Sequence, residues 1–313
     1  NLDTIAWVKR RVQRMSSPGR LLKIARWCAG AAAGGHLSLL KDLRHCKYTW
    51  DEDTTYWASR NGHVDVLDWA LENGCAASSY MYDVAAEFGR LNVIKYLHGK
   101  GYQYHGAELE LAAKNDHLEC FLYMWQRRNQ DDALYYDDDG VGAIFEFDEI
   151  MHAAGRCQKK ERKVLTWMVE HGWNCADKHN MACEGAAFVG NIEMLSWLRS
   201  MGFGWDTHAT AAAAAENKLD CLIWLHEHEC PLAPNIVLHA AKGGHFELLK
   251  WAVANGAQWH PNVCLLVAKQ GRYTFLRWAR ENGCPLGREC GARCGAEERA
   301  PLVGAQGDAP LDR

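Results

Sequence analysis

A pattern that returns every 27 residues constrains the fold of this chain more than any other feature of its sequence. The clearest copy runs from Ala240 to Gly256 and contains a central glycine, Gly244, which serves as its anchor. The equivalent anchors in the other copies are Gly35, Gly62, Gly89, Asp116, Lys160, Gly190, Asn217 and Gly271. Six of the eight spacings between anchors are 27 residues, and the exceptions are 44 and 30 residues. Such self-similarity is typical of a solenoid of stacked supersecondary units.

Each copy predicts a pair of helices, whose positions are counted from the anchor. Paired alanines at −4 and −3, such as Ala240 and Ala241, would let a first helix approach its neighbours closely. The anchor then makes a short turn, because glycine tolerates positive φ. A second helix follows with apolar residues at helical spacing and ends at a glycine at +12, such as Gly256. An apolar residue at +15, such as Trp259, is expected to fill the seam between units.

This frame resembles the ankyrin repeat family, whose pattern places paired alanines, Gly-His, two aliphatic residues, a glycine and an apolar residue at the same offsets. The resemblance covers roughly residues 26–286. Two departures matter: Asn235-Ile236-Val237-Leu238 replaces the family's Thr-Pro-Leu-His motif, and the period is six residues short of the family's 33. The missing residues are those of the family's β-hairpin. We therefore expect an all-α chain, an αα-hairpin solenoid of nine stacked ankyrin-like repeats.

The frame divides the chain into five segments. Residues 1–25 are predicted to form an N-terminal capping helix region, and residues 26–128 to hold repeats one to four. Residues 129–152 are predicted to be an acidic insertion loop, after which repeats five to nine follow in residues 153–286. Residues 287–313 are rich in Gly, Ala, Arg and Pro, and we expect a disordered C-terminal tail.

The insertion has eight acidic residues and no basic one between Asn129 and Glu149. An EF-hand loop needs an acid at its first position, but Tyr135 stands there when Asp137 and Asp139 take the third and fifth. We therefore expect a surface loop, without which the repeats still fold. A metal site or an enzyme built in this insertion is an alternative.

Composition argues for an intracellular protein with a structural use of cysteine. The formal net charge of −4 implies no strong attraction to nucleic acid or anionic membrane. No apolar run is long enough to span a bilayer, and no secretory signal opens the chain, whose first residue is Asn. Eight of the 13 cysteines occupy three repeat positions where other copies have small apolar residues. We expect a monomer in the cytoplasm, with the nucleus as a second possibility, because Lys9, Arg10, Arg11 and Arg14 could form an import signal.

No motif points to catalysis or to a cofactor. The sequence has neither a GxxxxGK[ST] nor a GxGxxG signature, and His226-Glu227-His228 lacks the spacing of a metal-binding helix. An aromatic residue recurs at position +7, as in Trp224 and Trp251. We interpret this ladder as half-buried packing between second helices rather than a stacking platform for nucleic acid. We expect no enzyme activity, no cofactor and no metal.

The predicted partner-binding residues lie at positions −2 and −1, because in ankyrin-like stacks the partner usually meets the end of the first helix. These positions differ between units, while the alanines two residues earlier barely change. The candidates are Arg60, Asn61, Glu87, Phe88, Lys114, Asn115, Phe188, Val189, Glu216, Lys242, Lys269 and Gln270. The resemblance implies a non-enzymatic scaffold for protein–protein interaction. An adaptor that presents a client to a ubiquitin ligase through a further domain is an alternative.

Overall fold

The computed structural model describes residues 25–102, 107–131, 141–172 and 180–285; for residues 25, 128–131 and 141–146 it describes the backbone alone. Within these ranges the chain forms 18 α-helices and no strand. The all-α expectation is therefore confirmed for this part of the chain. The predicted capping region up to residue 24 and the predicted C-terminal tail lie outside it, as do residues 132–140 of the acidic insertion.

The helices follow one another as nine pairs. The first helices are α2 (Ala25–Ala33), α4 (Glu52–Asn61), α6 (Met81–Glu87), α8 (Ala107–Lys114), α10 (Val141–Gly155), α12 (Met181–Val189), α14 (Thr207–Ala215), α16 (Ile236–Gly243) and α18 (Val263–Lys269). The second helices are α3 (Leu37–His45), α5 (Val64–Glu72), α7 (Leu91–Gly99), α9 (Leu118–Asp131), α11 (Lys163–Glu170), α13 (Ile192–Ser200), α15 (Leu219–Glu227), α17 (Phe246–Ala254) and α19 (Tyr273–Glu281).

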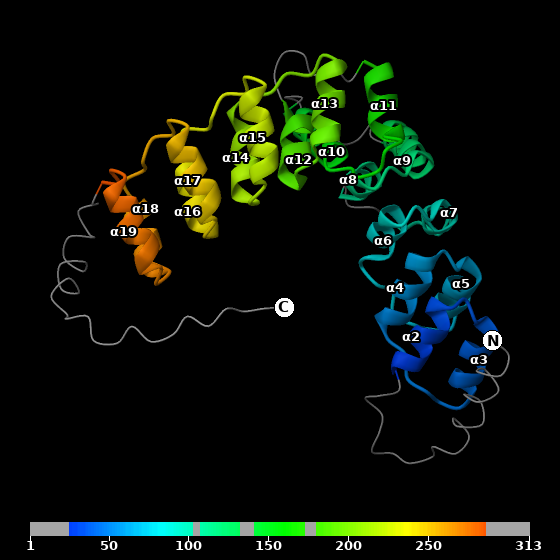
Figure 1. Ribbon diagram of the computed structural model, residues 1–313. Coiled ribbons are helices and arrows are strands. Elements are labelled where there is room, and N and C mark those ends of the chain that lie inside the picture. Colours follow the sequence, from blue (N-terminus) through cyan, green and yellow to red (C-terminus); the bar gives the residue numbers. More distant parts are fainter. Residues whose placement is uncertain (1–24, 103–106, 132–140, 173–179, 286–313) are drawn as a thin grey trace, which may run out of the picture. The chain divides into compact units, whose positions relative to one another are not determined.

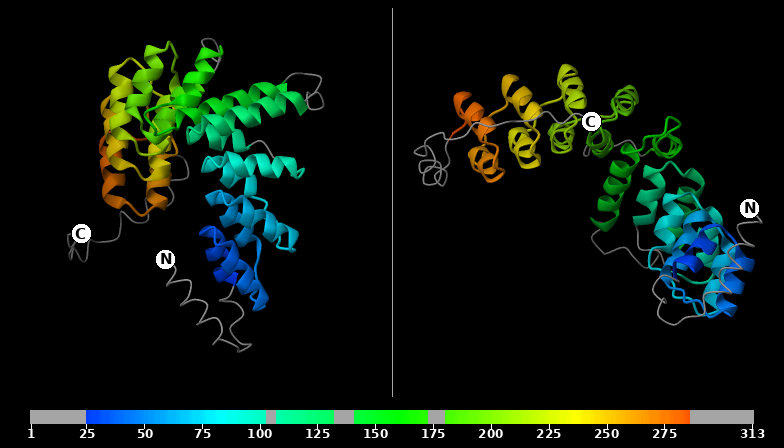
Figure 2. Two further views of the ribbon diagram at one scale, coloured as in Figure 1. Left: turned by 90° about the vertical axis from the view of Figure 1, so that its right-hand side faces the viewer. Right: turned by 60° about the horizontal axis from the view of Figure 1, so that its bottom comes forward.

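The chain divides into two compact units, residues 1–186 with 197–203 and residues 187–196 with 204–313. In the first unit the first helices α2, α4, α6, α8 and α10 pack in succession, and so do the second helices α3, α5, α7, α9 and α11. In the second unit α14 packs against α16, which packs against α18. Figure 2 shows these three pairs in succession in its right-hand view, coloured from yellow to orange. The first five pairs therefore contact one another in succession, and so do the last three.

Small residues on the first helices and a narrow apolar stripe on the second helices form the core. The paired alanines are buried in every copy that has them, from Ala31 and Ala32 to Ala240 and Ala241. Each second helix buries the residues at +4 and +8, such as Leu248 and Ala252, and all but α19 also bury the residue at +5. This spacing of three and four is the helical periodicity that the sequence predicts.

Left-handed residues end the helices where the frame places them. Eight of the nine anchors have positive φ, and so do all six glycines at +12 that the frame predicts as caps. Lys47 and Glu229 adopt the same conformation at +12 in two copies without glycine. Lys160, the anchor that the sequence frame assigns to the fifth pair, does not have positive φ. The left-handed residue in the turn between α10 and α11 is Arg162, with φ 50°.

The expected acidic loop over residues 129–152 is wrong for most of its described length. Residues 129–131 continue α9, and residues 141–152 belong to α10, the first helix of the fifth pair. Ile150 and Met151 are buried, and α10 packs against α8. The acidic residues obscured an apolar spacing that runs through Phe147, Ile150 and Met151. A deletion of Asp131–Asp148 would remove residues 141–148 of α10, a helix that packs on α8, and not only a loop.

Asp116 explains why the fifth pair departs from the frame. This anchor is an aspartate with φ 55°, and its Oδ1 accepts a hydrogen bond of 2.8 Å from the backbone N–H of Val164, in the first turn of α11. A helix begins with N–H groups that have no intrahelical acceptor, and an aspartate satisfies one of them well. The fourth pair thus caps the second helix of the fifth, across the longer turn at residues 156–162.

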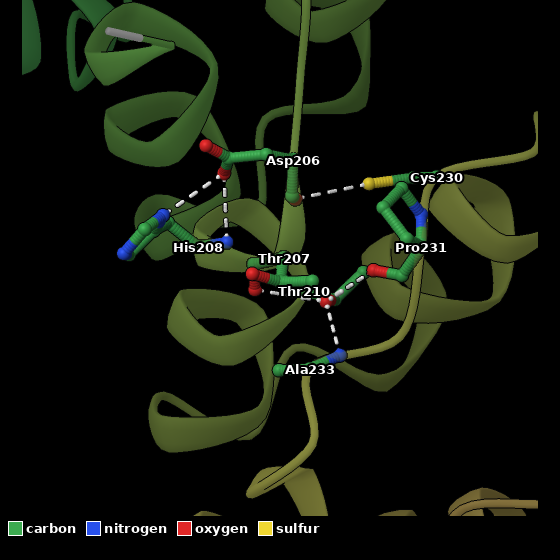
Figure 3. Close-up of polar contacts among 7 residues, drawn as sticks. All are labelled: Asp206, Thr207, His208, Thr210, Cys230, Pro231 and Ala233. Atoms are coloured by element: carbon green, nitrogen blue, oxygen red, sulfur yellow. Dashed lines mark hydrogen bonds and ion pairs between the residues drawn. The ribbon is translucent and has the colours of Figure 1, made fainter.

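A buried threonine at position −7 fixes the connection that follows the second helix in two copies. Thr210 Oγ1 lies 2.9 Å from the carbonyl oxygen of Pro231 and accepts a 3.0 Å hydrogen bond from the N–H of Ala233 (Figure 3). Thr55 makes the equivalent contacts with Ala76 and Ser78. These bonds hold the connection close to the first helix and replace the sheet bonds that a β-hairpin would make.

The glycine at position −5 gives a test of how closely first helices pack. A Cβ on Gly185 in α12 would overlap the backbone carbonyl of His152 in α10, whereas a Cβ on Gly30, at the same position of α2, would meet no atom within 4 Å. We predict that Gly185→Ala lowers the free energy of unfolding by about 2 kcal/mol or more, because backbone must move. Gly30→Ala should be neutral or stabilising by up to about 1 kcal/mol, because alanine favours helix. Urea denaturation of both variants measures the difference; equal effects would contradict the close approach.

Candidate partner-binding surface

In each unit the structure places the candidate residues at the same end of their helix pairs. Each lies at the C-terminal end of a first helix or in the turn that follows. We call the side chains at −2, −1 and +1 the turn edge. Glu216, Lys242, Lys269 and Gln270 are exposed. The remaining candidates are half-buried: Arg60, Asn61, Glu87, Phe88, Lys114, Asn115, Phe188 and Val189.

A hydrogen bond from the next pair caps the end of several first helices. His63 Nε2 lies 3.2 Å from the carbonyl oxygen of Ala33, and the Asn61 Nδ2 donates to the same oxygen at 2.9 Å. The carbonyl two residues before the anchor is an acceptor for Arg90, His117, His245 and Gln270 in later pairs, at 3.0 to 3.2 Å. Carbonyls in the last turn of a helix have no intrahelical donor, so each contact satisfies an exposed acceptor.

The same side chains explain why the anchor is usually glycine. A Cβ on Gly35 would overlap the His63 ring, and a Cβ on Gly89 would overlap the His117 ring. The glycine therefore provides both a left-handed turn and room for a ring from the next pair. The sequence suggested only the first reason. Histidine at +1, repeated at the same spacing as the glycines, is the signal that could have indicated the second.

Asn61 and Gln270 are thus structural as well as candidate binding residues. Asn61 bonds the end of α2, and Gln270 Nε2 donates to the carbonyl oxygens of Ala241 and Lys242 in α16. Their side-chain donors are already used within the fold. Asn115 likewise donates to the carbonyl oxygen of Leu111 in its own helix.

Phe88 packs on the preceding pair. The Arg60 guanidinium lies 4.1 Å from the centre of the Phe88 ring and 4.9 Å from that of Trp57. A cation over a ring face at such distances is attracted to it. Phe88 is therefore partly covered by α4, and an aromatic side chain at −1 does not by itself mark a partner-binding anchor.

Cations dominate the turn edge. In the second unit Lys218, Lys242, Lys269 and Arg272 lie at the edge, and the one acidic residue there is Glu216. Among the residues that the structure describes, none of these four cations has an ion pair with a carboxylate. In the first four pairs the edge carries Arg60, Arg90 and Lys114 against Glu87, and the fifth pair adds Lys159 and Glu161. The edge is therefore basic although the whole chain has a net charge of −4.

The aromatic residues at +7 are packed between neighbouring pairs. All are half-buried, as the sequence predicts. The residue at +15 of one pair packs edge-on against the +7 ring of the next, as in Trp50 with Trp69 and Trp205 with Trp224, whose ring centres are 5.6 and 5.7 Å apart. The ring faces are used as well, since His228 stacks on Trp224 at 4.0 Å. These rings form a seam within the fold.

The described residues hold no group of three or more His, Cys, Asp or Glu side chains that could bind a metal ion. Their cysteines are buried except for Cys46. Burial raises the pKa of Cys120 to about 11 and that of Cys221 to about 12, which makes both thiols poor nucleophiles at neutral pH. Asp137 and Asp139, whose spacing in the sequence does not fit an EF-hand loop, lie outside the described residues. No helix in the described part is long and apolar enough to cross a bilayer.

Comparison with protein-family models and with curated proteins finds no match for this chain.

The cap that His117 provides predicts a pH dependence of stability. Burial lowers the pKa of His117, the Lys159 cation lowers it further, and the Glu87 carbonyl opposes both. The folded pKa lies below the unfolded value, so the stability contribution is complete above about pH 6.5 and is lost as the pH falls through the folded pKa.

We predict that the free energy of unfolding falls more steeply from pH 8 to pH 5 in the wild type than in His117→Asn. Chemical denaturation at several pH values measures this slope. His45→Asn, which changes an exposed histidine with no ion pair among the described residues, should keep the wild-type slope. Parallel slopes for the wild type and His117→Asn would contradict the prediction.

Proposed function

We propose that this chain is a non-enzymatic scaffold of ankyrin-like repeats that binds a partner protein along its turn edge. The succession of nine helix pairs, with left-handed anchors and caps at fixed positions, supports a solenoid of this kind. The lack of strands in the described residues agrees with a short repeat whose β-hairpin is missing. A row of similar edges on a rigid frame is the usual recognition surface of repeat proteins.

The single observation that carries the proposal is the unpaired positive charge at the second unit's edge. Lys242 and Lys269 are exposed, and the described residues give them no carboxylate partner, whereas the Arg272 guanidinium lies 5.1 Å from the centre of the Phe246 ring. A long cationic side chain that serves no fold contact is available for recognition, and positive edges attract acidic partners electrostatically. The partner segment that fits this edge is therefore acidic.

The edge lysines are preferred over Phe88 and Phe188 as binding residues. Phe88 is covered by Arg60, and Phe188 is half-buried and takes part in an interaction within the fold. Binding energy at an interface is concentrated in residues whose burial is gained on association. Lys242 and Lys269 are exposed, so a partner can bury their side chains on binding.

The test is capture of proteins from a lysate of the cells that express this chain, at two salt concentrations. We predict that Lys242→Gln with Lys269→Gln reduces retention of the specific partner about tenfold, equivalent to about 1.4 kcal/mol. Higher salt should reduce retention in the same way, because screening weakens exposed charge pairs.

The matched control is Lys250→Gln with Arg277→Gln, which removes the same charge from the second helices α17 and α19. It should retain the partner at the wild-type level. Equal retention by both double variants, with unchanged melting temperatures, would refute the proposed edge.

A further inference from the structure

Two thiols meet in the last helix pair that the structure describes. Cys264 lies in α18, and Cys284 follows the end of α19. Their Sγ atoms are 2.6 Å apart, and both side chains are buried, Cys264 completely and Cys284 with 7% of its surface exposed. A disulfide bond requires about 2.05 Å between the sulfurs, so a shift of roughly half an ångström would bring them to bonding distance.

The repeat frame makes this meeting specific. Cys264 is at −7 and Cys284 at +13 of the pair anchored at Gly271. In the pair anchored at Asn217 these positions hold Thr210 and Cys230, and the Cys230 thiol points to the carbonyl oxygen of Asp206 at 3.4 Å (Figure 3). Cys75 has the same arrangement with Asp51, at 3.2 Å. Among the described residues, the pair anchored at Gly271 has cysteine at both positions.

Cys264 also differs from buried cysteines such as Cys120 and Cys221 in the direction of its pKa shift. The hydrogen bond with Cys284 lowers the pKa of Cys264, burial opposes it, and the Arg280 cation lowers it further. Burial without such a partner raises the pKa of Cys221 to about 12. A larger thiolate fraction makes Cys264 the more reactive nucleophile of this group.

We propose that Cys264 and Cys284 are a modification site, a thiol pair that hydrogen peroxide oxidises to an intrachain disulfide. The Cys264 thiolate attacks one peroxide oxygen, the O–O bond breaks, and Cys264 becomes a sulfenic acid while the released hydroxide takes up a proton as water. The Cys284 sulfur then attacks the sulfenic sulfur, the S–O bond breaks, and a second water leaves with the Cys284 proton. Two thiols and one peroxide give one disulfide and two waters.

The disulfide would tie α18 to the segment after α19. It closes a loop of 20 residues that contains both helices of the pair, which restricts their local opening. The modification is thus expected to stabilise this pair under oxidising conditions and to be reversed by a thiol reductant.

The experiment treats the full chain with hydrogen peroxide, blocks remaining thiols in denaturant and maps tryptic peptides by mass spectrometry. Four basic residues separate the two cysteines, so they fall in different peptides unless they are linked. We expect a 264–284 cross-link that dithiothreitol removes, and amide exchange in α18 and α19 at least about tenfold slower in the oxidised protein. Absence of this cross-link, or links from Cys264 to other cysteines in equal yield, would overturn the proposal.

Two variants make the test independent of folding defects. Cys230→Ser removes the thiol at the same frame position of the pair anchored at Asn217, and it should leave the 264–284 link unchanged. Thr210→Cys gives the pair anchored at Asn217 cysteine at both of these positions, and peroxide should then produce an additional 210–230 link. A folded Thr210→Cys protein without that link would show that the frame positions do not bring thiols together.

Discussion

The hydrogen bond between a side chain of one pair and the last turn of the preceding first helix is the contact on which the rest of this structure depends. First helices here have between 7 and 15 residues, and helices of that length are marginal in isolation. In α2, α4, α6, α14 and α16 a carbonyl in the last turn is satisfied from the next pair, as Ala33 is by His63 and Asn61. The donor needs a close approach, which the anchor glycine allows, and the alanine pair brings the helices near enough for it. One interaction thus fixes the turn, the helix end and the spacing between pairs.

Much of this fold could be predicted from the sequence because most of its rules act within one pair. The stripe at +4, +5 and +8 and the left-handed cap at +12 follow from local periodicity and backbone preference, and the structure has both. The fifth pair could not be predicted in the same way. There Asp116 caps α11 from 48 residues away, and no local sequence pattern indicates so distant a capping residue. The acidic composition before α10 also suggested a loop, although Ile150 and Met151 pack in the core.

The candidate site was harder to predict than the fold, since variation between copies has two physical origins. Lys242 and Lys269 vary with no structural demand on their ammonium groups, which remain exposed. Asn61 and Gln270 vary because the cap on the preceding helix can come from −1 as well as from +1, so that a change at one position is compensated at the other. A single sequence does not separate these two cases. The hydrogen-bond partners do, and they assign a structural role to Asn61, Asn115 and Gln270 among the twelve candidates.

The groups that are already bonded or packed within the fold limit what the turn edge can recognise. Backbone carbonyls at the edge are occupied by side chains of the next pair, so they are not available to a partner's N–H groups. The aromatic rings at +7 are occupied as well, because neighbouring rings and histidines cover them. The edge still presents the ammonium groups of lysines on long, flexible side chains. Exposed lysines of this kind raise the association rate and select partners of opposite charge. They contribute less to shape complementarity. A partner would therefore be chosen by an acidic segment and held in place by contacts that differ from one pair to the next.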